Sequence, residues 1–100
     1  MKTMTAEELR EKIETGERIA VLDVREDEEV AYGMIPGALH IPLGEIPARA
    51  AELETGAGYA VICRSGGRSA HACAFLESEG FEVTNVEGGM LEWTGETIAK

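Results

Sequence analysis

The sequence predicts an α/β fold in which helices cover both faces of a parallel sheet. Two apolar runs, residues 19–24 and 59–63, are nearly continuous, a pattern typical of strands that are buried on both faces. Helical patterns alternate with the strand patterns, and the connections between them are short. A chain of 100 residues fits one domain, so we expect a single domain over residues 1–100.

The first half of the chain contains a helix with signals at both ends. Thr5 and Glu8 have the spacing of a capping box, in which each side chain accepts a hydrogen bond from the other residue's backbone N–H. Leu9 and Ile13 then fall on one face, and Gly16 ends the helix. After the strand at 19–24, the patterns predict a short helix over 27–32, a strand over 38–41 and a helix over 46–53.

The second half repeats the alternation of strand and helix. After the strand at 59–63, the patterns predict a helix over 69–79, a strand over 81–86 and a short final helix that begins at Met90. In parallel sheets covered by helices, ligands bind beyond the carboxyl ends of the strands. Cys63 closes the strand at 59–63, so the order of the elements alone places it at the edge where a site is expected.

The charge and hydropathy of the chain restrict the partners that we expect. The formal net charge is −10 at pH 7, which disfavours nucleic acid and anionic membranes. No apolar run approaches the roughly 20 residues needed to cross a bilayer. The amino terminus lacks the apolar stretch of a secretory signal, so we expect a cytoplasmic protein with reduced cysteines. One segment departs from the acidic composition, because residues 57–74 contain two arginines and no acid.

This cationic segment contains a run, Cys63 to Ser69, with the composition of an anion-binding loop. Gly66 and Gly67 can adopt backbone angles that let successive N–H groups turn inward, and Arg64 and Arg68 add positive charge. A helix that starts after the loop would add the positive end of its dipole. A thiol in such surroundings ionises easily, so we expect Cys63 to be a catalytic nucleophile. The residues expected to bind the substrate are Arg64, Ser65, Gly66, Gly67, Arg68 and Ser69.

Structural roles compete with chemical ones for several residues. Cys63 as a mere buried residue before a turn would leave the glycines, the arginines and the helix start unexplained. Asp23 could be a second catalytic group, but an acid at a strand end more often fixes nearby loops, for example by pairing with Arg25. Cys73 could be a resolving thiol, but we expect it to be buried packing. The spacing of the cysteines and histidines does not suggest a metal site.

The chain resembles the rhodanese family of sulfurtransferases over nearly its whole length. The run Cys63 to Ser69 is similar to the active-site loop of that family. Further similar segments are residues 22–25, residues 33–38, residues 40–42, Gly80 with Phe81, and Gly88 with Gly89 followed by Trp93. One position departs from the family pattern. Met34 stands where the family often has histidine, and we expect the change to alter packing or the rim of the pocket.

The resemblance implies a doubly wound, five-stranded parallel sheet and sulfur transfer through a persulfide on Cys63. The implied donor is thiosulfate or another small anionic sulfur donor, such as a persulfide. The implied acceptor is cyanide or a thiol, including a protein thiol. No cofactor is expected beyond the sulfur carried on Cys63, and Asp23 and Arg25 are expected to support the site structurally.

Two other classes of function use similar features. Cysteine-dependent phosphatases and arsenate reductases also place an arginine after a cysteine in an anion loop, but their loops are one residue longer. Four residues separate Cys63 from Arg68 here, which makes a tighter cradle suited to one sulfur atom. A non-catalytic binding module with this fold would typically lack the cysteine or the loop, and this chain has both. The sequence therefore favours sulfur transfer.

Overall fold

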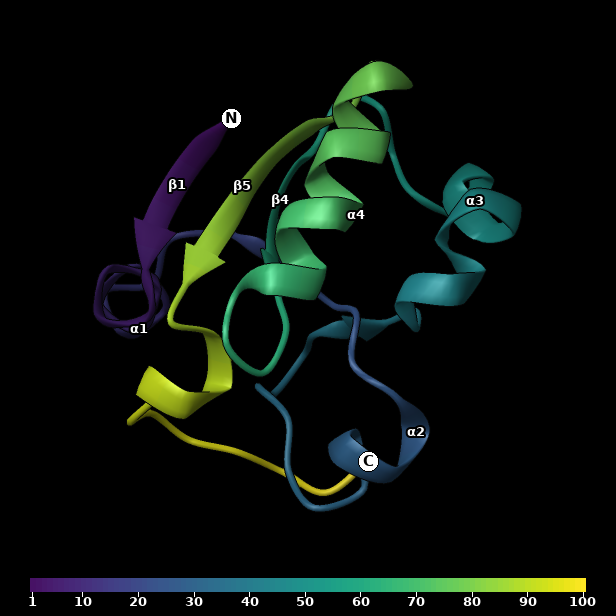
Figure 1. Ribbon diagram of the computed structural model, residues 1–100. Coiled ribbons are helices and arrows are strands. Elements are labelled where there is room, and N and C mark those ends of the chain that lie inside the picture. The colour runs from purple at the N-terminus through teal and green to yellow at the C-terminus, as the bar shows by residue number, and fades with distance from the viewer.

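The computed structural model describes residues 1–100 and contains one five-stranded sheet in which all neighbouring strands are parallel, in the order β1-β5-β4-β2-β3 (Figure 1). The strands are β1 (Lys2–Thr5), β2 (Ala20–Asp23), β3 (Leu39–His40), β4 (Gly58–Ile62) and β5 (Glu82–Glu87). The α-helices are α1 (Ala6–Glu14), α2 (Asp27–Val30), α3 (Ile46–Arg49) and α4 (Gly67–Ser78). Three 3₁₀ turns complete the chain: η1 (Leu43–Glu45), η2 (Ala50–Glu52) and η3 (Gly89–Glu92). The predicted α/β architecture is confirmed.

Apolar side chains form a separate core on each face of the sheet. One core lies under α3 and α4 and includes Leu22, Val61 and Leu76. The other lies under α1 and includes Leu9 and Val86. Because successive side chains of a strand point to opposite faces, the continuous apolar runs of β2 and β4 supply both cores. The strongly apolar strands therefore occupy the centre of the sheet, where a site at their carboxyl ends has neighbours on both sides.

The first strand is the element that the residue patterns did not predict. β1 lies at the edge of the sheet and pairs with β5, with Lys2 opposite Thr84 and Thr5 opposite Glu87. Its four residues are polar or half-buried, so they lack the apolar run that marked β2 and β4. Thr5 then begins α1 with the predicted capping box, in which the Thr5 and Glu8 side chains each accept a backbone N–H at 3.0 Å. Strand pairing, and not local propensity, defines this edge.

Four predicted helices differ from the structure at their ends. The helix expected over 27–32 ends at Val30, and the helix expected from Met90 is the 3₁₀ turn η3. The helix expected over 46–53 is only four residues long and is flanked by η1 and η2, and its Pro47 contributes no backbone N–H. The helix expected from Ser69 starts two residues earlier, at Gly67. This earlier start matters for the site, because it brings the amino end of α4 closer to Cys63. No helix in the structure has the length and the apolar character needed to span a membrane.

Candidate active site around Cys63

Cys63 directly follows β4 at the carboxyl edge of the sheet. In Figure 1 the arrows of β1 and β5 point toward the end of the molecule where the β4–α4 loop, α2 and η3 lie, and the parallel pairing of β4 with β5 means that β4 ends there as well. The alternation along β4 turns Cys63 to the α4 face, where it joins the core that contains Val61 and Cys73. Cys63 is 1% exposed in the structure. The sulfur is thus held in a defined position between the sheet and the start of α4.

The loop after Cys63 directs hydrogen-bond donors at the sulfur. The backbone N–H of Gly66 donates to Cys63 Sγ at 3.1 Å, and Ser69 Oγ lies 3.3 Å from it. Gly66 has a φ of 110°, which lies in the left-handed region that favours glycine. Gly67 has no such angle and begins α4, so only one of the two glycines takes the special conformation that was expected of both. α4 thereby points its positive end at the sulfur.

These surroundings favour ionisation of Cys63 over that of the second thiol. Burial raises the pKa of Cys63, but hydrogen bonds from the Ser69 side chain and from the backbone N–H groups of Ser69, Gly66 and Ser65 lower it more, so its pKa lies below the ordinary value. Cys73 is free and fully buried, and burial raises its pKa to about 12. Only Cys63 has the character of an activated nucleophile, and Cys73 lies in the core as expected.

The two loop arginines have different environments. Both terminal nitrogens of the Arg68 guanidinium, Nη1 and Nη2, donate to the Glu29 carboxylate, at 2.6 and 2.8 Å. The Arg68 hydrogen bonds hold the pKa of Glu29 down at about 2, so this pair stays ionised over most of the pH range. Arg64 is exposed and makes no ion pair. Arg64 is therefore the loop arginine without an ion pair, and substrate binding by either arginine stays a prediction.

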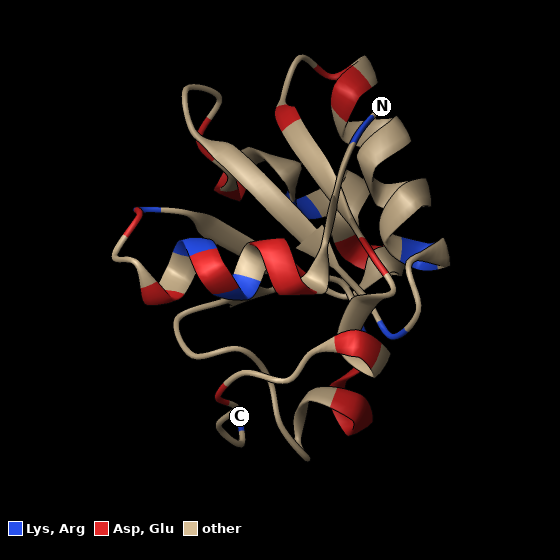
Figure 2. Cartoon of the chain, turned by 90° about the vertical axis from the view of Figure 1, so that its left-hand side faces the viewer, with Lys and Arg blue, Asp and Glu red and all other residues tan.

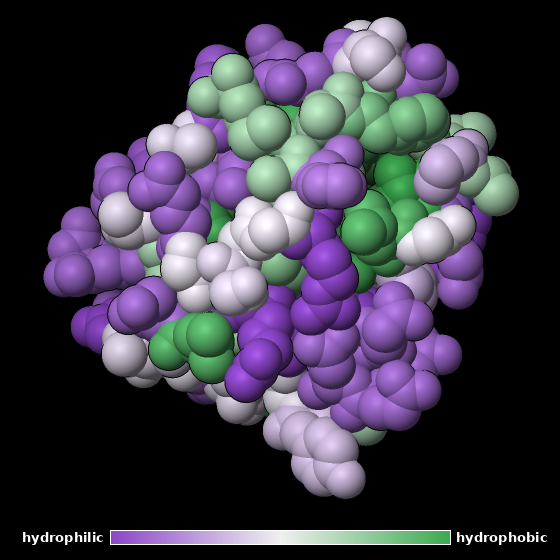
Figure 3. All heavy atoms as spheres, in the orientation of Figure 1, coloured by the Kyte–Doolittle hydropathy of each residue, from purple (hydrophilic) through white to green (hydrophobic).

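The charge distribution around the loop follows from these contacts. Figure 2 shows basic segments on the β4–α4 loop and at the start of α4, with acidic segments on the short helices nearby. Figure 3 shows hydrophilic side chains gathered over α2 on the face seen in Figure 1. The Glu29 carboxylate comes from α2, 39 positions away from Arg68 in the sequence. The cationic character predicted for the loop is thus partly neutralised by an acidic neighbour.

The turn η3, which follows β5, holds the start of the β4–α4 loop in place. The N–H groups of Met90 and Leu91 donate to the carbonyls of Cys63 and Arg64, at 2.9 and 3.0 Å. Gly89 has a φ of 52°, and a Cβ added there would lie 2.4 Å from the Cys63 carbonyl oxygen. A side chain at this position is therefore excluded by the backbone of the loop itself. Gly89, the second glycine of the Gly88–Gly89 pair, therefore has a structural role in supporting Cys63.

A buried polar side chain, Asn85, contacts the loop from β5. Ser69 Oγ donates to Asn85 Oδ1 at 2.5 Å, and Asn85 Nδ2 donates to the Gly66 carbonyl at 3.3 Å. Sequence reasoning did not select Asn85 or Glu29. Asparagine is uncommon inside strands, so its place directly before Val86 in β5 is a signal that could have identified the first, because buried amides need partners. Glu29 accepts the Glu26 N–H at 2.9 Å at the start of α2, but nothing local to it indicates its pairing with Arg68.

Asp23 and Arg25 form a buried ion pair next to the site. The Asp23 carboxylate accepts from the Arg25 backbone N–H and guanidinium at 2.9 to 3.2 Å. Arg25 also donates to the Gly33 carbonyl at 2.8 Å, and its own carbonyl lies 2.7 Å from His40 Nε2. These bonds connect the ends of β2 and β3 to the segment before Met34. The contacts fit the structural role that was expected for both residues.

Met34 packs inside this supporting region. Its side chain is buried, and its backbone exchanges two hydrogen bonds with Ile98, at 2.7 and 2.9 Å. The position where the family often has histidine therefore lies under the carboxyl-terminal segment. This placement agrees with the expected effect on packing.

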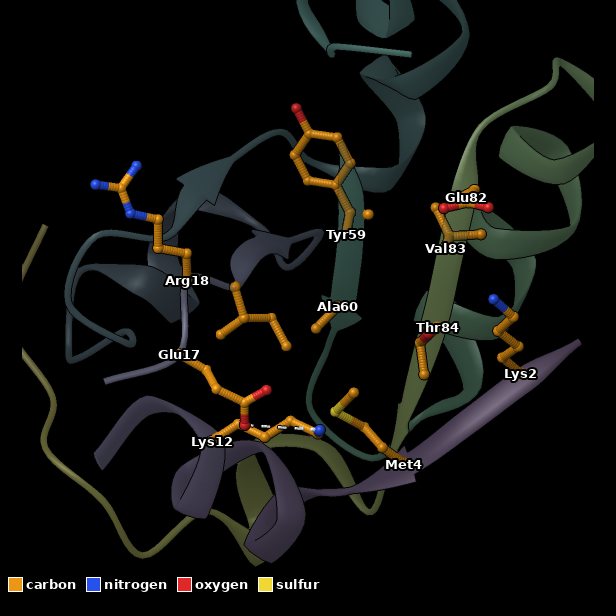
Figure 4. A pocket seen from close by; sticks show the side chains of 12 residues that line it. Lys2, Met4, Lys12, Glu17, Arg18, Tyr59, Ala60, Glu82, Val83 and Thr84 are labelled. Atoms are coloured by element: carbon orange, nitrogen blue, oxygen red, sulfur yellow. Dashed lines mark ion pairs between the residues drawn. The ribbon is translucent and has the colours of Figure 1, made fainter. Parts of the chain in front are cut away.

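The cavity drawn in Figure 4 lies at the amino-terminal ends of the strands, opposite the end that holds Cys63. It has a volume of about 280 Å³, and its lining includes Lys2, Gly58 and Glu82, which are the first residues of β1, β4 and β5. Lys12 and Glu17 form an ion pair with a 3.8 Å separation at its margin. Because the strands are parallel, this cavity and Cys63 are separated by the length of β4. The cavity is no part of the site around Cys63.

Comparisons with known proteins give matches over nearly the whole chain. A sequence model of the family described as "Rhodanese-like domain" matches residues 5–96. YtwF of Bacillus subtilis, which carries a provisional sulfurtransferase name, is 50% identical over 100 residues that cover 100% of this chain and 97% of YtwF. A protein of Allochromatium vinosum named sulfurtransferase is 38% identical over 88% of this chain and 83% of its own length. The crystal structure of a rhodanese-like domain protein from Staphylococcus aureus matches with a TM-score of 0.94 and 39% identity, covering 100% of this chain and 99% of that one.

Proposed function

This chain belongs to the rhodanese-like domain family, and we propose that it is a sulfurtransferase that carries sulfane sulfur on Cys63. One observation supports the proposal above others: Cys63 Sγ lies at the amino end of α4 and accepts a hydrogen bond from the Gly66 N–H. Such a position stabilises negative charge on the sulfur, both as a thiolate and after a second sulfur has been added. The names of the two sulfurtransferase relatives agree with this chemistry.

The proposed reaction has two steps. In the first, the Cys63 thiolate attacks the outer sulfur of a donor such as thiosulfate. A Cys63–sulfur bond forms, the sulfur–sulfur bond of the donor breaks, and sulfite leaves with the electron pair. In the second, an acceptor such as cyanide or a thiolate attacks the outer sulfur of the persulfide, and Cys63 leaves as a thiolate. The cycle needs no external oxidant or reductant.

The loop residues contribute binding and charge stabilisation to this cycle. The inward-turned N–H groups of Ser65, Gly66 and Ser69 stabilise the thiolate and the terminal sulfur of the persulfide. Arg64 is free to attract an anionic donor and to hold the departing anion. Arg68 binds the donor through its terminal nitrogens only in competition with Glu29, which accepts from both Nη1 and Nη2. Arg64 is therefore the main donor-binding arginine in our proposal.

The proposal makes a direct prediction for the two cysteines. With thiosulfate and cyanide as substrates, the protein should form thiocyanate, and Cys63→Ser should abolish this activity because a serine hydroxyl does not form the persulfide. Cys73→Ser is the matched control and should retain turnover, since Cys73 is buried and its thiol stays protonated at neutral pH. Turnover that survives in Cys63→Ser would refute the assignment of the nucleophile.

The same preparation separates sulfur transfer from the phosphatase alternative. A phosphate ester needs a free arginine at the end of a roomy loop. The loop between Cys63 and Arg68 is tight, and Arg68 is bound by Glu29, so this site does not offer one. A chromogenic phosphate ester should remain intact under conditions where thiocyanate forms. Hydrolysis of the ester that disappears in Cys63→Ser would favour the phosphatase.

A thiol of a partner protein is an acceptor that fits the same chemistry. The exposed Arg64 marks the open side of the loop, where an acceptor would approach. Cys63 must be reduced to act, so we expect the protein to work in the cytoplasm. These two expectations belong to the proposal and are tested by transfer of labelled sulfur to reduced protein thiols and by cell fractionation.

A further inference from the structure

The Ser69 hydroxyl has one hydrogen and two neighbours that can accept it. Ser69 Oγ lies 2.5 Å from Asn85 Oδ1 and 3.3 Å from Cys63 Sγ. All three residues are at least nine-tenths buried. A hydroxyl donates a single hydrogen bond, so donation to Asn85 excludes donation to the sulfur. The shorter distance assigns the hydrogen to Asn85 in this structure.

The orientation of the Asn85 amide is fixed by the loop. Its Nδ2 donates to the Gly66 carbonyl oxygen at 3.3 Å, and this oxygen also accepts from the Ala70 N–H at 3.2 Å. Turning the amide over would place Oδ1 against the Gly66 carbonyl, where two acceptors would repel each other. Asn85 therefore presents an acceptor, and not a donor, to Ser69.

We propose that Asn85 is a positioning residue that competes with the Cys63 sulfur for the hydroxyl hydrogen of Ser69. While Cys63 is a thiol, Ser69 donates to Asn85 and its oxygen is free to accept from the S–H group. When Cys63 loses its proton, the Ser69 hydrogen turns to the thiolate, and the buried Asn85 Oδ1 loses its donor. After sulfur is added, Cys63 Sγ is neutral and the hydrogen returns to Asn85.

This competition opposes ionisation of Cys63. A buried acceptor without a donor costs free energy, and that cost falls on the thiolate state. Charged and titratable groups come from every element around the sulfur. By position these elements carry Arg64 in the loop, Arg68 and Cys73 on α4, Glu26 before α2 and Glu29 within it, Asp23 at the end of β2 with Arg25 after it, and Glu87 at the end of β5. A substitution of Asn85 changes none of these groups. Its effect on the pKa of Cys63 therefore reports on the hydrogen bond that Ser69 donates.

The test is a titration of Cys63 in Asn85→Leu. Leucine has a similar size and accepts no hydrogen bond, so Ser69 is left to donate to the sulfur. We expect the pKa of Cys63 to fall by about one unit, the equivalent of about tenfold more thiolate at low pH. The measurements are ultraviolet absorbance of the thiolate and the rate of iodoacetamide alkylation against pH, with the alkylated residue identified by mass spectrometry. Asn85→Val, which suits a strand, provides the same test if the leucine variant does not fold.

The control is the same change in a Ser69→Ala background. There the hydrogen is absent, so Asn85→Leu should leave the pKa of Cys63 unchanged. A merely structural Asn85 would loosen the loop and weaken the N–H bonds to the sulfur, which would raise the pKa in Asn85→Leu. An unchanged or raised pKa in Asn85→Leu, or an equal fall with and without Ser69, would overturn the proposal.

This inference rests on the proposed role of Cys63 as a thiolate, but its test needs no sulfur donor. A lowered pKa that depends on Ser69 would support the role of Asn85 even in a protein that fails to transfer sulfur. If the wild-type protein forms no thiocyanate but the variants show that pKa shift, the result would count against the proposed function and not against the role of Asn85. The two proposals therefore fail separately.

Discussion

Gly66 shows how a single residue controls the chemistry of this loop. Its left-handed φ of 110° directs its N–H to Cys63 Sγ, and its carbonyl accepts from Asn85. The neighbouring Gly67 has helical geometry, and a Cβ added to it would meet nothing within 4 Å. Two glycines that look equivalent in the sequence therefore have different constraints.

The two glycines form a matched pair for mutation. Gly66→Ala should lower the free energy of unfolding by about 1–2 kcal/mol, because a side chain is strained in the left-handed region. It should also slow alkylation of Cys63, because the Gly66 N–H no longer aims at the sulfur. Gly67→Ala should leave the alkylation rate unchanged and should not lower the free energy of unfolding, because Gly67 has helical geometry and a Cβ there meets nothing within 4 Å. Chemical denaturation and alkylation rates check both effects, and equal effects of the two changes would contradict the geometry.

At the scale of elements, the site depends on contacts that connect α2, α4 and η3 to the end of β4. Glu29 of α2 binds Arg68 of α4, and η3 binds the carbonyls of Cys63 and Arg64. These elements are short except for α4, so they owe their positions to such contacts more than to their own helical bonds. The Glu29–Arg68 pair is the contact with a clear pH signature.

Glu29→Gln should destabilise the protein in a pH-dependent way. The pKa of Glu29 in the folded state is about 2, below the ordinary value of 4.5, so its contribution to stability is complete above 4.5 and is lost as the pH falls toward 2. Because the pair is partly exposed, we expect a loss of about 1 kcal/mol at neutral pH. The difference from the wild type should shrink below pH 4.5.

The exposed neighbour Glu28 supplies the control for this prediction. It lies on the same short helix and makes no ion pair, so Glu28→Gln should leave the free energy of unfolding nearly unchanged. Urea denaturation of the three proteins across the acidic range provides the measurement. A Glu29→Gln effect of constant size down to pH 2 would contradict the assignment of the pair.

At the scale of the whole molecule, most of the fold follows from the order of sequence patterns. The central strands β2 and β4 were predictable because burial on both faces requires continuous apolar runs. β1 was not, because its strand conformation comes from pairing with β5, whose residues lie at the other end of the chain. The ends of α3 and α4 were missed because turn geometry and tertiary contacts decide where a helix begins and ends, and local propensity does not describe them.

The site, like the fold, was predictable where its residues follow one another in the sequence. Cys63 and its loop are contiguous, so their composition showed an anion nest at a strand end. The residues that modify the nest, Glu29 and Asn85, reach it from α2 and β5, at sequence separations of 39 from Arg68 and 16 from Ser69. One sequence without its fold does not show these pairings. The structure adds the groups that compete for the loop's charge and hydrogen bonds.

The most direct test of sulfur transfer through Cys63 is mass spectrometry of the intact protein after treatment with thiosulfate and removal of the excess. We expect a gain of one sulfur atom that maps to Cys63, is absent in Cys63→Ser, persists in Cys73→Ser, and disappears when cyanide is added. A protein that forms no adduct on Cys63 with thiosulfate or with a persulfide donor, although the thiol is reduced and alkylates readily, would rule out sulfur transfer through Cys63.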